Sequence, residues 1–261
     1  MSDSPIHRPL NHRMDDALVK VPEVTLLFWI LKIAATTLGE TGGDAVSMSM
    51  NLGYLVGTLI FAVVFLAAVT AQIRTGPFRP PLYWVTIIAS TTVGTTLADF
   101  ADRSLGIGYA GGASLLLGLL CASLIVWYRA MGSISVSSIG SPKAELFYWV
   151  TIMFSQTLGT ALGDWTADTA GLGYTGGALV FVGLLAGVVA AYFGTRVSRT
   201  MLFWIAFVLT RPLGAVVGDF LDKPVNAGGL ALSRYSASAA LLAFIVGSMF
   251  LFRQRAASRV H

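Results

Sequence analysis

A tryptophan, a glycine and an aspartate recur four times along the chain at one fixed spacing. In every copy the glycine follows the tryptophan by ten residues and the aspartate by fifteen, so each copy reads W-x9-G-x4-D. The copies are Trp29, Gly39, Asp44; Trp84, Gly94, Asp99; Trp149, Gly159, Asp164; and Trp204, Gly214, Asp219. Four such matches in register are far beyond chance, so the chain is built from four copies of one structural unit.

The spacing between copies divides the chain into two halves. The tryptophans are 55, 65 and 55 residues apart, so copies one and two recur 120 residues later as copies three and four. The ten additional residues in the middle form the Ser/Gly stretch GSISVSSIGS, which is typical of a linker. We predict a cytoplasmic N-terminal tail (1–22), a first half (23–130), a linker (131–143), a second half (144–252) and a basic C-terminal tail (253–261). Each half holds two helical-hairpin repeats.

Long apolar segments place the chain among membrane proteins. Apolar residues make up 55% of the sequence and charged residues only 11%, which excludes an ordinary soluble domain. Apolar windows of about 20 residues, the length a helix needs to cross a bilayer, occur at 23–42, 51–72, 81–100, 109–128, 145–165, 174–194, 200–219 and 235–252. The sequence therefore predicts an all-α membrane protein with eight transmembrane helices in four tandem helical hairpins.

The distribution of basic residues predicts the orientation of these helices. Most of the 17 lysines and arginines lie in the tails or between repeats, whereas the loops within repeats hold only Arg103, Lys223 and Arg234. Because positively charged loops stay on the cytoplasmic side, both termini are expected in the cytoplasm. Each repeat contains two helices, so all four repeats enter the membrane in the same direction. The two halves are then parallel and pseudo-symmetric.

A Gly-Tyr pair follows the motif in three copies, as GYLVG, GYAGG and GYTGG. With this pair and the fourfold tryptophan, residues 23–252 resemble a bacterial family of membrane proteins made of four tandem two-helix repeats of unknown function, DUF347. The resemblance implies a multi-pass protein of the bacterial inner (cytoplasmic) membrane and implies no activity. The fourth copy departs from the pattern, because Arg211 and Pro212 replace the Thr-Thr or Gln-Thr pair of the other copies.

The first helix of each repeat is expected to carry a polar seam, because residues four apart share a helix face. The seams are Lys32, Thr36, Glu40, Asp44; Ile87, Thr91, Thr95, Asp99; Ile152, Gln156, Thr160, Asp164; and Phe207, Arg211, Ala215, Asp219. Ionisable groups inside membranes usually face a bundle interior. We therefore expect the first helices to surround a common polar space and the second helices to face lipid. The predicted polar pathway is Lys32, Thr36, Thr91, Thr95, Gln156, Thr160 and Arg211.

Acidic residues gather at one end of these seams. Metal or proton binding is predicted for Glu40, Asp44, Asp99, Asp102, Asp164, Asp168, Asp219 and Asp222. All three histidines are in the tails and Cys121 is the sole cysteine, so oxygen ligands favour protons, Mg²⁺, Ca²⁺ or Mn²⁺ over zinc or copper(I). In an alternative interpretation the aspartates only end their helices near the membrane surface. An acid is unfavourable at a helix C-terminus, and Glu40 lies a full turn deeper, which favours binding.

Two basic residues, Lys32 and Arg211, share the seams with the acids. One interpretation is that they neutralise nearby carboxylates permanently. In the other, Lys32 holds Glu40 or Asp44 until a cation binds, or Arg211 binds the negative group of an organic substrate.

The recurrent glycines and tryptophans are expected to have structural roles. Close helix packing is predicted at Gly39, Gly94, Gly159 and Gly214, with local unwinding that exposes carbonyl ligands as an open alternative. Anchoring at the membrane interface is predicted for Trp29, Trp84, Trp149 and Trp204, which fall near the predicted cytoplasmic helix starts.

The leading functional hypothesis is a transporter of a hard divalent cation, with Mn²⁺ slightly favoured and proton exchange as a natural coupling. Open alternatives are a transporter of a small organic solute that uses Arg211 or Lys32, a non-catalytic membrane scaffold, and an intramembrane aspartyl hydrolase. The chain contains no ATP-binding loop or dinucleotide motif, so ion gradients would drive transport. The expected partners are the lipid bilayer and a divalent cation or proton. No enzymatic activity, cofactor or nucleic-acid partner is expected.

Overall fold

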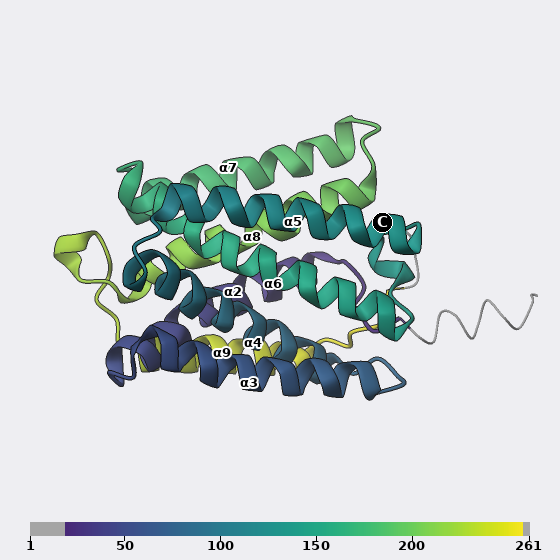
Figure 1. Ribbon diagram of the computed structural model, residues 1–261, viewed down its shortest axis with the longest axis horizontal. Helices are drawn as coiled ribbons and strands as arrows, with labels where there is room; N and C mark the ends of the chain where they lie inside the picture. The colour runs from purple at the N-terminus through teal and green to yellow at the C-terminus, as the bar shows by residue number, and fades with distance from the viewer. Residues whose placement is uncertain (1–18, 258–261) are drawn as a thin grey trace, which may run out of the picture.

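The computed structural model describes residues 19–257, and eight long helices account for most of them (Figure 1). The helices are α2 (Leu26–Asp44), α3 (Gly53–Arg74), α4 (Pro80–Asp99), α5 (Tyr109–Met131), α6 (Pro142–Asp164), α7 (Gly173–Gly194), α8 (Arg199–Asp222) and α9 (Arg234–Leu251). Within the described residues the only β contact is an isolated antiparallel bridge between Pro22 and Ala256. The all-helical architecture and the positions of the eight apolar segments are therefore confirmed.

The first helices of the four repeats form a closed ring. Helices α2, α4, α6 and α8 pack in this order, and α8 returns to α2. These four helices are mostly buried, because each is enclosed by two ring neighbours and an outer helix.

The motif glycine of each repeat lies at a close contact between two ring helices. A Cβ atom at Gly39 would collide with Thr91, and one at Gly94 would collide with the backbone of Gln156. The same clash would occur between Gly159 and Arg211 and between Gly214 and Thr36. In each case the added atom would lie closer than 3.0 Å to the next helix. The fourth contact joins repeat four to repeat one, so the contact pattern is cyclic, and glycine is required because any side chain would separate the helices.

The second helices form an outer layer, and each packs on a ring helix that belongs to a different repeat. Helix α3 packs on α4, α5 on α6, α7 on α8, and α9 on α2. Each outer helix therefore covers the ring helix of the following repeat, and the two helices of one repeat make few contacts with each other. The repeats are consecutive hairpins in the sequence, but the packing unit in space joins two neighbouring repeats.

Five helices are long and apolar enough to cross a membrane by length and composition, namely α3, α5, α7, α8 and α9. The outer helices of this group present apolar side chains on their exposed faces, as at Leu59, Leu115 and Leu179. Helices α2, α4 and α6 fall outside this group because threonines, glycines and acids interrupt their apolar residues. Their polar seams are buried against the ring neighbours.

Three of the four motif tryptophans lie inside the bundle, which corrects the prediction that they anchor the membrane interface. Trp84, Trp149 and Trp204 are 1%, 2% and 4% exposed, and they belong to one core cluster with Phe28. Trp29 is half-buried against the same cluster. The tryptophans sit on the ring helices, so neighbouring helices cover them and only Trp29 is partly accessible.

The two described chain ends pair at one end of the bundle, on the right in Figure 1. The amide of Glu23 donates to the Arg255 carbonyl at 2.8 Å, and the amide of Ala257 donates to the Val21 carbonyl at 2.8 Å. Lys20 is buried and its Nζ lies 2.6 Å from Glu145 Oε1. Residues 19–22 of the predicted N-terminal tail are therefore part of the packed bundle, and the rest of that tail lies outside the described residues.

Candidate cation-binding site

The polar seams of the ring helices face one another inside the bundle. Their polar members are all buried, with exposed fractions of 3% or less: Lys32, Thr36, Glu40, Asp44, Thr91, Thr95, Asp99, Gln156, Thr160, Asp164, Arg211 and Asp219. Equivalent seam positions on the four ring helices form layers, which follow one another along the helix axes. The aspartates occupy the layer furthest from the tryptophans, and we call Asp44, Asp99, Asp164 and Asp219 the acidic layer.

The Lys223 ammonium bridges two members of the acidic layer. Its Nζ lies 2.6 Å from Asp44 Oδ2 and 2.9 Å from Asp219 Oδ1. Burial alone lowers the pKa of Lys223, but Asp219, Asp44 and Asp222 together raise it well above its ordinary value. Lys223 is therefore held as a cation between the first and fourth repeats.

Arg103 bridges the other two members in the same way. Its Nε lies 2.8 Å from Asp99 Oδ1, and its Nη2 lies 3.7 Å from Asp164 Oδ2. Burial opposes its charge, but Asp99 and Asp164 raise its pKa well above the ordinary value. Arg103 and Lys223 both stand nineteen residues after the motif tryptophan, in repeats two and four. Two cations thus bridge the four aspartates of the acidic layer in two pairs.

Two groups of three carboxylates are close enough to share a metal ion. One oxygen from each of Glu40, Asp44 and Asp99 lies within 4.8 Å of the others, and the same holds for Asp44, Asp219 and Asp222. All five residues are buried, and Asp44 belongs to both groups. An all-oxygen set of this kind suits Mg²⁺, Ca²⁺ or Mn²⁺.

Arg234, the first residue of α9, brings a third cation to this end of the ring. Its Nε lies 2.9 Å from Asp222 Oδ2 and 3.7 Å from Asp44 Oδ2. Asp164 is the least satisfied member of the acidic layer, since within residues 19–257 its buried Oδ2 accepts no hydrogen bond and has only the long contact to Arg103.

The remaining two predicted acids lie outside these groups. Asp168 is exposed. Asp102 is half-buried, and burial raises the pKa of its carboxyl while neighbouring Arg103 lowers it. They belong to the π-helical turns after α4 and α6 and to neither group of three carboxylates.

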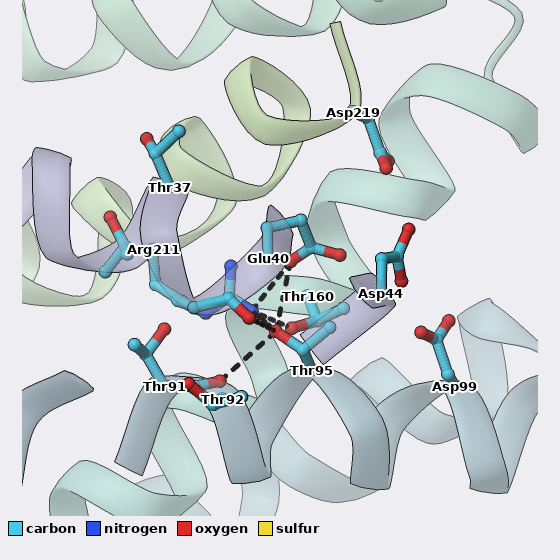
Figure 2. Close-up of polar contacts among 12 residues, drawn as sticks. Thr37, Glu40, Asp44, Thr91, Thr92, Thr95, Asp99, Thr160, Arg211 and Asp219 are labelled. Carbon is cyan, nitrogen blue, oxygen red and sulfur yellow. Dashed lines mark hydrogen bonds and ion pairs between the residues drawn. The ribbon is translucent and has the colours of Figure 1, made fainter. Parts of the chain in front are cut away.

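Glu40 lies one layer deeper, where it pairs with Arg211 (Figure 2). Arg211 Nη2 lies 2.9 Å from Glu40 Oε2 and donates to the hydroxyls of Thr95, at 2.6 Å, and Thr160. The Thr95 hydroxyl also donates to Glu40 Oε2 at 3.2 Å. All four ring helices therefore contribute to one buried polar cluster, with Asp44, Asp99 and Asp219 to one side of it (Figure 2).

Lys32 has a different environment from the one predicted. Its Nζ lies 3.5 Å from Thr210 Oγ1 and 4.1 Å from the centre of the Phe207 ring. The expectation that Lys32 holds Glu40 or Asp44 is therefore wrong, because Arg211 pairs with Glu40 and Lys223 with Asp44. Lys32 lies two turns before Glu40 on α2, on the side of the aromatic cluster.

The first three motif aspartates do not stand at a free helix end. Each is followed by a π-helical turn, at Ala45–Ser49, Phe100–Ser104 and Trp165–Thr169. In repeat four, α8 continues past Asp219 to Asp222. Simple helix termination therefore does not account for the aspartates, and wider π turns are often found beside functional sites.

Comparison with known protein families identifies the family to which these repeats belong. The family model described as Repeat of Unknown Function (DUF347) matches residues 27–77, 82–133, 147–198 and 202–256. The chain belongs to the DUF347 family. Each matched segment of this DUF347 chain covers most of one ring helix and the outer helix that follows it in the sequence. No curated protein and no solved structure matches the chain.

The sequence interpretation missed the bridging role of Arg103, Lys223 and Arg234, which it treated only as exceptions to the charge distribution. A signal was present for two of them, because Arg103 and Lys223 occupy the same position relative to the tryptophan. The corresponding residues of repeats one and three are Met48 and Asp168, so the fourfold pattern does not hold at this position.

Proposed function

We propose that this DUF347 protein is a multi-pass carrier of the bacterial inner membrane for a hard divalent cation, with Mn²⁺ the favoured substrate. The acidic layer would bind the cation, and Glu40 and Asp222 would complete its two groups of three carboxylates. The observation that carries the proposal is the bridging of four buried, symmetry-related aspartates by Lys223 and Arg103. In the proposal, a bound cation would replace these tethered charges as the counter-ion of the aspartates.

In this proposal all eight helices cross the membrane, with both termini in the cytoplasm and the two halves parallel. Helices of 18 to 24 residues are about 27–36 Å long at 1.5 Å per residue, enough to span the hydrocarbon core. The less apolar α2, α4 and α6 are shielded from lipid by the outer helices. The pairing of the two chain ends supports a common side for both termini.

The layers beyond the acids favour a carrier over an open pore. A cation that leaves the acidic layer towards the tryptophans meets Arg211 and then Lys32, both fully buried in the ring. Two positive charges on the path oppose the passage of a divalent cation. Release on the other side would therefore require the ring helices to rearrange.

Exchange against protons follows from the crowding of the acids. A carboxylate cluster that binds a divalent cation must give up any protons it holds, so metal binding and proton release are linked. The proposed carrier would move protons in the direction opposite to the metal.

Flux measurements in proteoliposomes test the proposal. Uptake of Mn²⁺, Mg²⁺, Ca²⁺ and Co²⁺ would be compared for wild type, Asp44→Asn and Asp168→Asn. Asp44 belongs to both carboxylate groups, whereas Asp168 is an exposed acid outside the ring, so it is a matched control. We expect uptake that Asp44→Asn abolishes and Asp168→Asn preserves. Absence of any cation flux with folded wild type, or full flux with Asp44→Asn, would reject the cation carrier.

A further inference from the structure

The ring contains a fully buried lysine with no carboxylate partner among residues 19–257. Lys32 Nζ has one long hydrogen bond, 3.5 Å to Thr210 Oγ1, and a contact with the Phe207 ring. An ammonium group carries three donors, so most of its hydrogen-bonding capacity is unused. A buried charge with neither counter-ion nor hydrogen bonds is strongly unfavourable.

Arg211, one layer further along, also has unused donors. Its hydrogen bonds to Glu40, Thr95 and Thr160 are all made by Nη2. Its Nε and Nη1 are buried and have no hydrogen-bond partner within residues 19–257. When both basic groups are protonated, Glu40 balances only one of their two positive charges.

The two basic groups belong to one neighbourhood. Lys32 contacts Thr210, the residue before Arg211 on α8. The Thr91 hydroxyl, in the same layer as Arg211, is buried and unpartnered as well (Figure 2). The unpaired Gln156 Oε1 of that layer is a neutral acceptor and does not balance the charge.

We infer that the unused donors of Lys32 and Arg211 bind a small monovalent anion, a halide or a carboxylate group, separately from the acidic layer. Such an anion supplies the missing charge and accepts hydrogen bonds from Lys32 Nζ, Arg211 Nε and Nη1, and the Thr91 hydroxyl. The inference goes beyond cation transport, because the anion site lies on the opposite side of the Glu40–Arg211 pair from the acidic layer.

Thermal unfolding of the purified full chain tests this site directly. Melting temperatures would be measured in sodium chloride, sodium acetate and sodium isethionate, a larger sulfonate without a carboxylate group, at equal ionic strength. We expect chloride or acetate to raise the melting temperature of wild type saturably relative to isethionate. Lys32→Met, which keeps the length of the side chain and removes its charge, should lose this response. Lys143→Met, an exposed lysine near the start of α6, should keep it.

The possible outcomes separate the ligand classes. A response to chloride assigns a halide site, and a response to acetate alone assigns a carboxylate site, as expected for an organic anion. Equal melting temperatures of wild type in all three salts, or an unchanged response in Lys32→Met, would overturn the inference. If Lys32→Met does not fold, radiolabelled chloride and acetate binding to wild type decides, with one anion per chain expected. These results do not depend on cation flux or on Asp44→Asn.

Discussion

At the scale of single residues, Glu40 and Arg211 form a buried ion pair inside the ring. Both side chains are buried, and Arg211 is fully enclosed. Glu40→Gln leaves the guanidinium without its counter-ion, and breaking a buried ion pair in this way costs about 3 kcal/mol or more. We expect a matching fall in the free energy of unfolding, measured in detergent. Adding Arg211→Met should restore part of it, and a single substitution without effect would contradict the pairing.

Lys223 gives a second prediction at this scale. Lys223→Met removes the ammonium that bridges Asp44 and Asp219 and leaves their carboxylates to a soluble cation. Mn²⁺ should then raise the melting temperature of the variant more than that of wild type, because the tethered competitor is gone. Lys143→Met, which lies outside the network, should behave like wild type. A smaller Mn²⁺ response in Lys223→Met would show that the lysine supports the site.

At the scale of helices, the glycine contacts predict where a single methyl group is harmful. Gly159→Ala would place a Cβ atom against the side chain of Arg211 and push α6 away from α8. Overpacking of this kind costs about 1–3 kcal/mol. Gly183→Ala in α7 meets no atom within 4 Å and should be neutral or slightly stabilising. Thermal unfolding of both variants checks the difference, and equal losses would argue against the close contact.

The helices themselves could be predicted from sequence, but several partners could not. Windows of about 20 apolar residues define a helix by a local property, so the eight helices were recognisable. The seam residues were also recognisable, because i, i+4 spacing fixes a helix face. The partners of Lys32 and Glu40 depend instead on which helix lies opposite α2. Because α8 lies there, Arg211 pairs with Glu40 and leaves Lys32 without a carboxylate among the described residues. The burial of Trp84 has the same origin, since a tryptophan at a helix start is compatible with either lipid or core.

At the scale of the whole molecule, the chain closes on itself in a cyclic order. Helix α9 of the last repeat packs on α2 of the first, and Thr41 Oγ1 lies 2.8 Å from Ser238 Oγ across this contact. In a Cys121→Ser background, Thr41→Cys with Ser238→Cys should form an intramolecular disulfide. Thr41→Cys with Ser123→Cys, on α5, should not. Cross-linking assessed by electrophoresis of cleaved protein checks the order, and equal yields would contradict the ring.

The proposed exchange of a divalent cation against protons at the acidic layer is tested most directly by recording Mn²⁺ uptake and internal pH in the same proteoliposomes. Wild type should take up Mn²⁺ while protons leave, and Asp219→Asn should lose both signals together because Asp219 belongs to one of the two carboxylate groups. Mn²⁺ uptake without proton movement would reject the coupling. No uptake by folded wild type, or full uptake by Asp219→Asn, would contradict the account.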